Sequence, residues 1–184
     1  LFGVIPPFAD QPVFAEGETR FRGEAVAAVV GTRDAVEALD LSAFPVTWEE
    51  RSPVLSIAAA LDPSAPQLQA KRPGNILVKG FVARGDVDEA FASAPVTVEA
   101  AFETGFVEHA YIEPEAGWAR RVGERIEITA STQAPYMDRD DTAAIMGLPP
   151  ESIRIIPSAC GGGFGSKLDL SVQPYVALAA WVTG

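Results

Sequence analysis

The residues with the clearest chemical potential lie between residues 158 and 170, in the stretch SACGGGFGSKLDL. Four glycines and a lone phenylalanine stand there between the isoleucine-rich run IRIIP and an apolar helix expected from about Leu170. Glycine inside a regular element costs roughly 0.5–1 kcal/mol relative to alanine, so this density indicates a tight turn or a backbone that approaches a partner closely. A strand, a loop and a helix in this order present free N–H groups and a helix N-terminus to an anion. A phosphate or an oxyanion is therefore the expected ligand.

A nucleotide triphosphate is disfavoured by the details of this loop. The run GGGFGSK comes close to the P-loop pattern G-x-x-x-x-G-K-[ST], but Ser166 takes the place of the second glycine. Leu168 replaces the hydroxyl residue that would hold Mg²⁺. The Rossmann pattern G-x-G-x-x-G is not matched either. On the loop alone, a tight turn and contact with some other cofactor remain equal alternatives.

The single histidine, His109, stands beside three glutamates, Glu108, Glu113 and Glu115. This group could form a non-haem metal site or an acid–base site. One histidine offers few strong ligands, however, and the alternation in HAYIEP predicts a strand with only some of these groups on one face. We therefore expect structural hydrogen bonding here, with Glu113 buried and paired.

Gln133 and Cys160 each have a structural and a functional interpretation. Gln133 in STQAP, taken alone, is typical of a polar residue at a strand end that caps the next helix. Cys160 could be a reactive thiol at a helix N-terminus, but a small buried core residue is the favoured interpretation. Because Cys160 is the only cysteine, no disulfide forms within the chain, which fits a reducing compartment and a cytoplasmic location.

Composition excludes several classes of partner. The 14 basic residues are scattered among 25 acidic ones and the net charge is −11, so we expect no nucleic-acid partner. The most apolar stretch, from Val172 to Val182, is about half of the roughly 20 residues that a membrane-spanning helix needs, so we expect no membrane span. With 48% hydrophobic residues, the chain can bury the core of one domain or of two small ones.

The elements that must position these residues predict a mixed α and β protein, α+β in class. Strands are expected where apolar runs or alternation occur, at 24–30, 45–50, 95–105, 116–122, 125–132 and 153–157. Gly123 and Glu124 would turn the fourth and fifth of these into a hairpin. Helices are expected at 31–41, 52–61, 85–94, 135–147 and from about 170.

Local signals mark the ends of these helices and the boundary between two domains. Thr32 is the expected N-cap of the first helix. Pro135 opens the fourth helix and Gly147 ends it. That helix should bury one apolar stripe, which consists of Met137, Ala144, Ile145 and Leu148. Residues 62–80 carry many prolines and glycines and are expected to connect the two domains.

Three motifs in order resemble the large subunits of molybdenum hydroxylases, the group of xanthine dehydrogenase, aldehyde oxidase and carbon monoxide dehydrogenase. They are VEHAYIEPEAGWA, STQAP and GGGFGSK, and GDVDEAFASAPVTVEAAF leads into them. The resemblance implies that residues 1–62 are the latter part of a hammerhead domain and 63–80 a connecting segment. Residues 81–184 would be the N-terminal part of the molybdopterin-binding domain. The abrupt start LFGVIPPF fits a fragment of a larger subunit.

The resemblance also implies a cofactor and the residues that contact it. The cofactor is molybdenum–molybdopterin or its dinucleotide form, in which the pterin holds the metal and no protein ligand is needed. Gly162, Gly163, Phe164 and Gly165 match the segment that lies against the ligands of the metal, where larger side chains would block the approach. Gln133 matches a glutamine whose amide donates a hydrogen bond to the apical oxo group.

The activity implied is that of an oxidoreductase that hydroxylates an aldehyde, an N-heterocycle or a similar small substrate with oxygen from water. Purine-oxidising relatives carry a glutamate after the loop lysine, where this chain has Leu168, so a purine is disfavoured. The general base lies further toward the C-terminus in this family, so we expect no catalytic residue here and an inactive fragment. Iron–sulfur and FAD groups are expected on other domains or subunits. The alternative is a non-catalytic module for cofactor binding or subunit docking.

Overall fold

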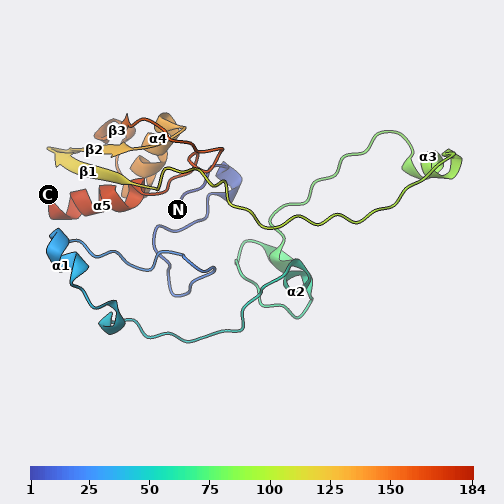
Figure 1. Cartoon of the computed structure of the whole chain (residues 1–184), viewed down its shortest axis with the longest axis horizontal. Coiled ribbons are helices and arrows are strands. Elements are labelled where there is room, and N and C mark those ends of the chain that lie inside the picture. The colour runs from blue at the N-terminus through green and yellow to red at the C-terminus, as the bar shows by residue number, and fades with distance from the viewer. The chain divides into compact units, whose positions relative to one another are not determined.

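The computed structural model describes residues 1–184, which divide into two compact units. One unit comprises residues 1–39 and 106–184, and the other comprises residues 40–105. The first unit contains all three strands and the two longest helices (Figure 1). It therefore contains both the hydrophobic core and the glycine loop.

A three-stranded sheet is the centre of the first unit. Strand β1 (Gly117–Val122) pairs antiparallel with β2 (Arg125–Ala130), and β3 (Ile153–Pro157) pairs parallel with β2. The predicted hairpin is thus confirmed. Gly123 turns it with a φ of 63°, a left-handed conformation that favours glycine. Strands β2 and β3 are parallel, so both end at the same edge of the sheet. Ser131 and Ser158, which follow these strands, lie at that edge.

Two helices pack against one face of this sheet. Helix α4 (Pro135–Met146) connects β2 to β3, and α5 (Gln173–Thr183) follows the glycine loop. Pro135 lies in the first turn of α4, and Gly147 ends that helix at a φ of 65°, as predicted. Helix α5 begins at Gln173 and not near Leu170, so residues 166–172 separate the glycine loop from the helix N-terminus. The glycine loop therefore does not lead directly into this helix.

The core lies between the sheet and these helices. Ile126 and Ile128 of β2 are fully buried, because the central strand is flanked by β1 and β3, while α5 packs on β1 and β2 and α4 packs on β3. The opposite face of the sheet carries charges. Arg120 and Arg154 both bond to Glu127, and the hydrogen bonds from Arg120 are the main reason why the pKa of Glu127 is lowered. The core cluster consists of Ile126, Ile128, Ala130, Ala143, Ile153 and Ala177.

The predicted apolar stripe of α4 is wrong in part, because Leu148 packs against the core and Ile145 is half-buried but the other two members are not. Met137 and Ala144 are exposed, and the helix buries Asp138, Thr142 and Ala143 instead. Asp138 accepts a hydrogen bond from the Gln173 side chain of α5 at 3.0 Å. Burial, together with the nearby Asp141 and Asp169 carboxylates, raises the pKa of Asp138 to about 6 despite that bond. A polar pair between two helices therefore replaces the apolar contact that the sequence pattern predicts.

Asp138→Asn should stabilise the chain at neutral pH. A carboxyl whose pKa is raised in the folded state holds its proton more tightly there, so its contribution to stability falls as the pH rises from 3.8 to about 6. Asparagine keeps the acceptor for Gln173 without a charge. We therefore expect the free energy of unfolding to rise by about 1–3 kcal/mol above pH 7 and to change little at pH 4. Thermal unfolding across this pH range measures the difference. Asp140→Asn, on the exposed side of the same helix, is the control, and an equal gain from both variants would contradict the assignment.

The remaining helices are short, and each follows a capping residue, of which Thr32 is the one that the sequence predicts. Helix α1 (Arg33–Glu37) has Thr32 as its N-cap, and the Thr32 hydroxyl accepts a hydrogen bond from the amide of Ala35. In the second unit, α2 (Ile57–Leu61) and α3 (Val87–Ser93) are capped in the same way by Ser56 and Asp86. Four short 3-10 helices complete the chain, at Pro6–Phe8, Leu41–Ala43, Pro73–Asn75 and Pro150–Ser152.

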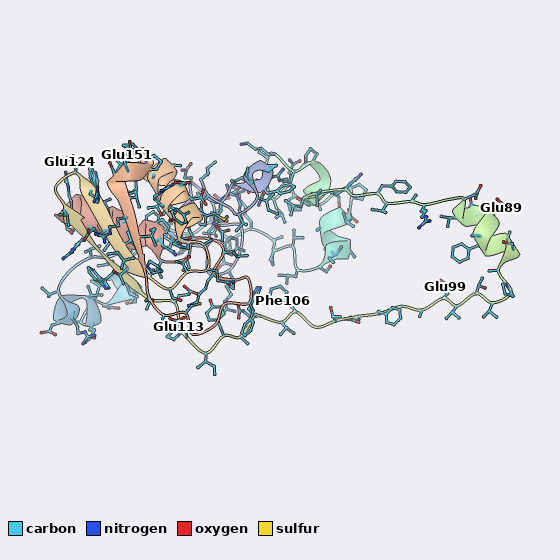
Figure 2. The ribbon with its side chains drawn as sticks, turned by 90° about the horizontal axis from the view of Figure 1, so that it is seen from above. Glu89, Glu99, Phe106, Glu113, Glu124 and Glu151 are labelled. Atoms are coloured by element: carbon cyan, nitrogen blue, oxygen red, sulfur yellow. The ribbon has the colours of Figure 1, made fainter.

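Three predicted strands do not form. Residues 24–30, 45–50 and 95–105 are not assigned to any strand, and no strand pairs with them. Between Glu99 and Phe106 the side chains stand away from an extended backbone (Figure 2). A strand needs a neighbour to accept and donate its ladder of hydrogen bonds, and local alternation does not supply one.

None of the helices has the length and the apolar character that a membrane crossing requires.

Candidate functional site

The glycine loop adopts a backbone that few side chains tolerate. Gly162 has a φ of 119° and Gly165 a φ of 100°, both in the region that favours glycine. Phe164 between them is a non-glycine residue with a φ of 52°, and its side chain is 75% exposed. Phe164 is thus not a core aromatic, and a strained backbone of this kind is typical of functional sites.

Three consecutive amides of this loop have no hydrogen-bond partner within the chain. They belong to Gly162, Gly163 and Phe164. The amides on either side are engaged, because Gly161 donates to Glu113 at 2.8 Å and Gly165 donates to Gln133 at 3.0 Å. Successive N–H groups in a backbone of this kind form a cavity for an anion or for electron-rich ligands. The loop is therefore held at both ends and offers its donors in the middle.

Gln133 lies directly against the loop. Its Oε1 atom accepts the bond from Gly165, and its own backbone amide donates to the carbonyl of Lys167 at 3.0 Å. A Cβ atom at Gly163 would lie 2.3 Å from Gln133 Oε1, so only glycine fits there without displacing the amide. No bond engages the Gln133 NH₂ group, which is left as a neutral donor beside the loop. Gln133 does not cap α4, because that helix has no side-chain cap.

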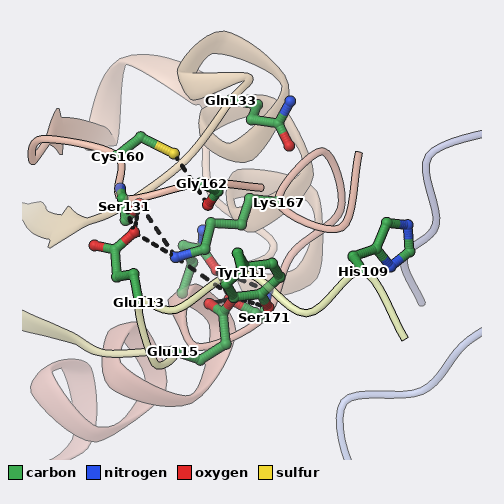
Figure 3. A network of polar contacts seen from close by, with 12 residues as sticks. His109, Tyr111, Glu113, Glu115, Ser131, Gln133, Cys160, Gly162, Lys167 and Ser171 are labelled. Atoms are coloured by element: carbon green, nitrogen blue, oxygen red, sulfur yellow. Dashed lines mark hydrogen bonds and ion pairs between the residues drawn. The ribbon is translucent and has the colours of Figure 1, made fainter. Parts of the chain in front are cut away.

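An ion pair between a buried lysine and a partly exposed glutamate lies beneath the loop (Figure 3). The Lys167 side chain is 1% exposed, and its Nζ donates to Glu113 Oε2 at 2.8 Å. The same oxygen accepts hydrogen bonds from Ser131 and from the amide of Gly161. The bonds from Lys167, then Gly161, then Ser131 lower the pKa of Glu113 to about 2. The prediction that Glu113 is paired is confirmed, although its side chain keeps 25% of its exposure.

Further polar contacts surround Lys167. Burial acts to lower the pKa of Lys167, but the hydrogen bond to Glu113 and the Glu115 carboxylate offset it, so that the pKa is raised. The ammonium lies 4.7 Å from the centre of the Tyr111 ring, a cation–π contact. Tyr111 donates its hydroxyl proton to Glu115, which also accepts from Ser171. The segment that carries Tyr111, Glu113 and Glu115 is thus tied to the loop by several bonds.

His109 and Cys160 do not belong to this network. His109 lies in no strand, and its Nδ1 is 3.3 Å from the carboxylate of the adjacent Glu108. No group of three or more His, Cys, Asp or Glu side chains could hold a metal ion. Cys160 is exposed, and its thiol donates to the carbonyl of Gly162 at 3.4 Å. The prediction of a buried Cys160 is wrong, because the chain has already left the sheet at this point.

Lys167 is the residue of this site that sequence analysis did not identify. A signal was present, because a buried Glu113 needs a cationic partner and basic residues are few in this chain. Lys167 ends the loop motif GGGFGSK, in which it fills the lysine position of the incomplete P-loop pattern. The structure brings together Gln133, the glycine loop, Glu113 and Lys167 from segments far apart in the sequence.

Comparisons with known proteins show which family this chain belongs to. The sequence model of the molybdopterin cofactor-binding domain matches residues 68–184. A probable xanthine dehydrogenase subunit of Bacillus subtilis is 37% identical over 184 residues, which are 100% of this chain and 24% of that protein. The nicotinate dehydrogenase large molybdopterin subunit of Eubacterium barkeri is 37% identical over 185 residues, covering 99% of this chain and 42% of that subunit.

A solved structure is similar as well. The aldehyde oxidoreductase of Desulfovibrio gigas superposes with a TM-score of 0.66 at 29% identity, over 74% of this chain and 15% of that protein. The chain therefore spans less than half of the length of each of these relatives.

Proposed function

The chain belongs to the molybdopterin cofactor-binding domain family, and from this membership we propose that it forms one wall of the molybdenum–pterin site in the large subunit of a molybdenum hydroxylase. The observation that carries the proposal is the row of three amides without a partner, at Gly162, Gly163 and Phe164. The cofactor fits these residues chemically. Its oxo, sulfido and pterin groups are hydrogen-bond acceptors, and the loop with Gln133 offers only neutral donors.

The roles of the loop residues follow from their conformations. Gly162, Gly163 and Phe164 would present backbone N–H groups to the cofactor, and the absence of a side chain at the glycines lets the acceptors approach closely. Gly165 would border the same surface, with its own amide bonded to Gln133. The Gln133 NH₂ group would donate to the cofactor while Gln133 Oε1 stays bonded to Gly165. Donors fixed in advance stabilise charge that develops during a reaction without rearranging at that moment.

When bound, the cofactor supplies two-electron redox chemistry that hydroxylates a substrate carbon with oxygen from water. The residues of this chain bind and orient it. None of them is placed as the general base, and we propose that this base lies on a later part of the same subunit, so that the chain alone is inactive. Iron–sulfur and flavin groups on other domains or subunits would take up the electrons.

The whole protein would be an oxidoreductase for a small aldehyde or N-heterocycle. Two relatives support these classes by name, a nicotinate dehydrogenase and an aldehyde oxidoreductase, whereas the probable xanthine dehydrogenase subunit is named for a purine. Leu168 after the loop lysine argues against a purine. Residues 1–62 would be the latter part of a hammerhead domain, joined by 63–80 to the molybdopterin-binding part at 81–184. A cytoplasmic location remains a prediction from the single cysteine.

Gln133→Ala tests the proposed function in the complete subunit. We expect the unsubstituted subunit to purify with molybdenum and pterin, and the variant to retain about one tenth as much, because a loss of 1–2 kcal/mol in hydrogen bonding corresponds to roughly that factor. Elemental analysis and pterin fluorescence measure the content. Gln67→Ala, a change at an exposed glutamine outside the site, is the control. A subunit without molybdenum, or a variant with full content, would contradict the proposal.

A further inference from the structure

We infer that the carboxylate of Glu113 positions the glycine loop for its ligand, with Lys167 as the counter-charge that keeps this carboxylate in place. The inference rests on the proposed function for the nature of the ligand. The group of Glu113, Ser131, Gly161 and Lys167 is called the Glu113 anchor below. Neither charged residue is required to touch the cofactor, so both are positioning residues.

One oxygen atom holds both ends of the loop. Glu113 Oε2 accepts from the amide of Gly161 at 2.8 Å, where the loop begins, and from Lys167 Nζ at 2.8 Å, where it ends. It also accepts from the Ser131 hydroxyl at 2.9 Å, directly after β2. The three amides without a partner lie between these two fixed points. The span that offers donors is thus fixed at its ends by a single acceptor.

Close packing leaves this arrangement little freedom. A Cβ atom at Gly161 would lie 2.8 Å from Glu113 Cβ, so the loop backbone approaches the glutamate directly. Lys167 is held a second time, because its carbonyl accepts from the backbone of Gln133 at 3.0 Å. The Glu113 anchor therefore fixes the loop and the proposed cofactor donor of Gln133 in one unit.

Stability alone is a weak reason for such a pair. Removing two charges from water has a large desolvation cost, and well-packed apolar residues are often as stabilising as a buried ion pair. In some proteins, however, a buried polar or ionic pair selects one arrangement of the chain, and we infer that role here. A loop that must present three amides in one direction needs that arrangement.

The experiment uses Lys167→Met and Glu113→Gln in the complete subunit. Hydrogen–deuterium exchange of peptides covering 158–168 and 125–130 is measured without cofactor, and the rate of cofactor loss is measured with it. We expect exchange in the loop and loss of cofactor to rise at least tenfold in both variants, with exchange in β2 unchanged. Lys167→Arg should restore much of the protection, because it keeps a charged donor. If Glu113 and Lys167 act as one unit, loop exchange and cofactor loss in the double variant should be no faster than in the more affected single variant.

Matched controls separate the possible outcomes. Arg139→Met breaks the exposed ion pair with Asp140 and should change none of these rates. Unchanged loop exchange in Glu113→Gln, whose side chain keeps its shape, would overturn the inference even if Lys167→Met did not fold. Equal increases in the loop and in β2 would also overturn it, since they indicate general destabilisation. A subunit that holds no molybdenum–pterin would refute the proposed function instead, and the exchange comparison would still test the Glu113 anchor.

Discussion

Replacing Gly163 by alanine should lower the affinity for the molybdenum–pterin cofactor by roughly 10- to 100-fold while the chain remains folded. The new Cβ atom would lie 2.3 Å from Gln133 Oε1 and 2.8 Å from Gln133 Cδ, which is far closer than contact allows. The end of the glutamine side chain can swing away, so the cost in stability is small. That movement breaks the bond from Gly165 and withdraws the Gln133 donor from the cofactor. The two losses together should lower the binding free energy of the cofactor by about 1–3 kcal/mol.

Cofactor titration of the complete subunit, with thermal unfolding of the same samples, measures both parts of this prediction. Gly80→Ala is a matched control, because no atom lies within 4 Å of a Cβ there and its backbone is not left-handed. In a Gln133→Ala background the alanine at 163 no longer collides with the amide, so its effect on affinity should largely disappear. Full additivity of the two changes would contradict the proposed contact between Gly163 and Gln133.

Elements with local sequence signals could be predicted, and those that depend on a distant partner could not. Thr32, Pro135, Gly147 and the turn at Gly123 act within a few residues of the chain, and each lies where the sequence indicates. The runs expected to form strands at 24–30, 45–50 and 95–105 have the right pattern but no neighbouring strand. Their apolar side chains are therefore largely exposed in this structure, including Val96, Val98 and Phe102.

Within the site the same distinction holds. The turn-forming glycines and the adjacent position of Gln133 follow from motifs that are readable in the sequence, and the structure brings them together. The role of Lys167 could not be predicted, because its partner Glu113 is 54 residues away and the pair forms only when β1, β2 and the loop are in place. Hydrophobic periodicity also failed for part of α4, where Asp138 is buried and accepts a hydrogen bond from Gln173 of α5.

Ile128→Ala should destabilise the chain more than any surface substitution, by about 3–4 kcal/mol. Ile128 is fully buried at the centre of β2, opposite Ala119 on β1 and Ile155 on β3. Truncation of a buried isoleucine to alanine costs roughly 2–5 kcal/mol, because it removes apolar contacts and leaves a cavity between neighbours that cannot all move inward. The middle of this range applies here, since Ile128 is fully buried in one core cluster with Ala143 of α4 and Ala177 of α5.

Urea unfolding of residues 1–184 tests this prediction against Ile112→Ala, which makes the same chemical change at a side chain that is 97% exposed. We expect the control to change stability by less than about 0.5 kcal/mol. Equal losses of unfolding free energy in the two variants would contradict the position of Ile128 in the core. Because β2 runs directly into Ser131 and Gln133, the sheet is the frame on which the site is built. Ile128→Ala should therefore destabilise the sheet, whereas Gly163→Ala should weaken cofactor binding and leave the sheet intact. The two variants thus separate the stability of the fold from the affinity for the cofactor.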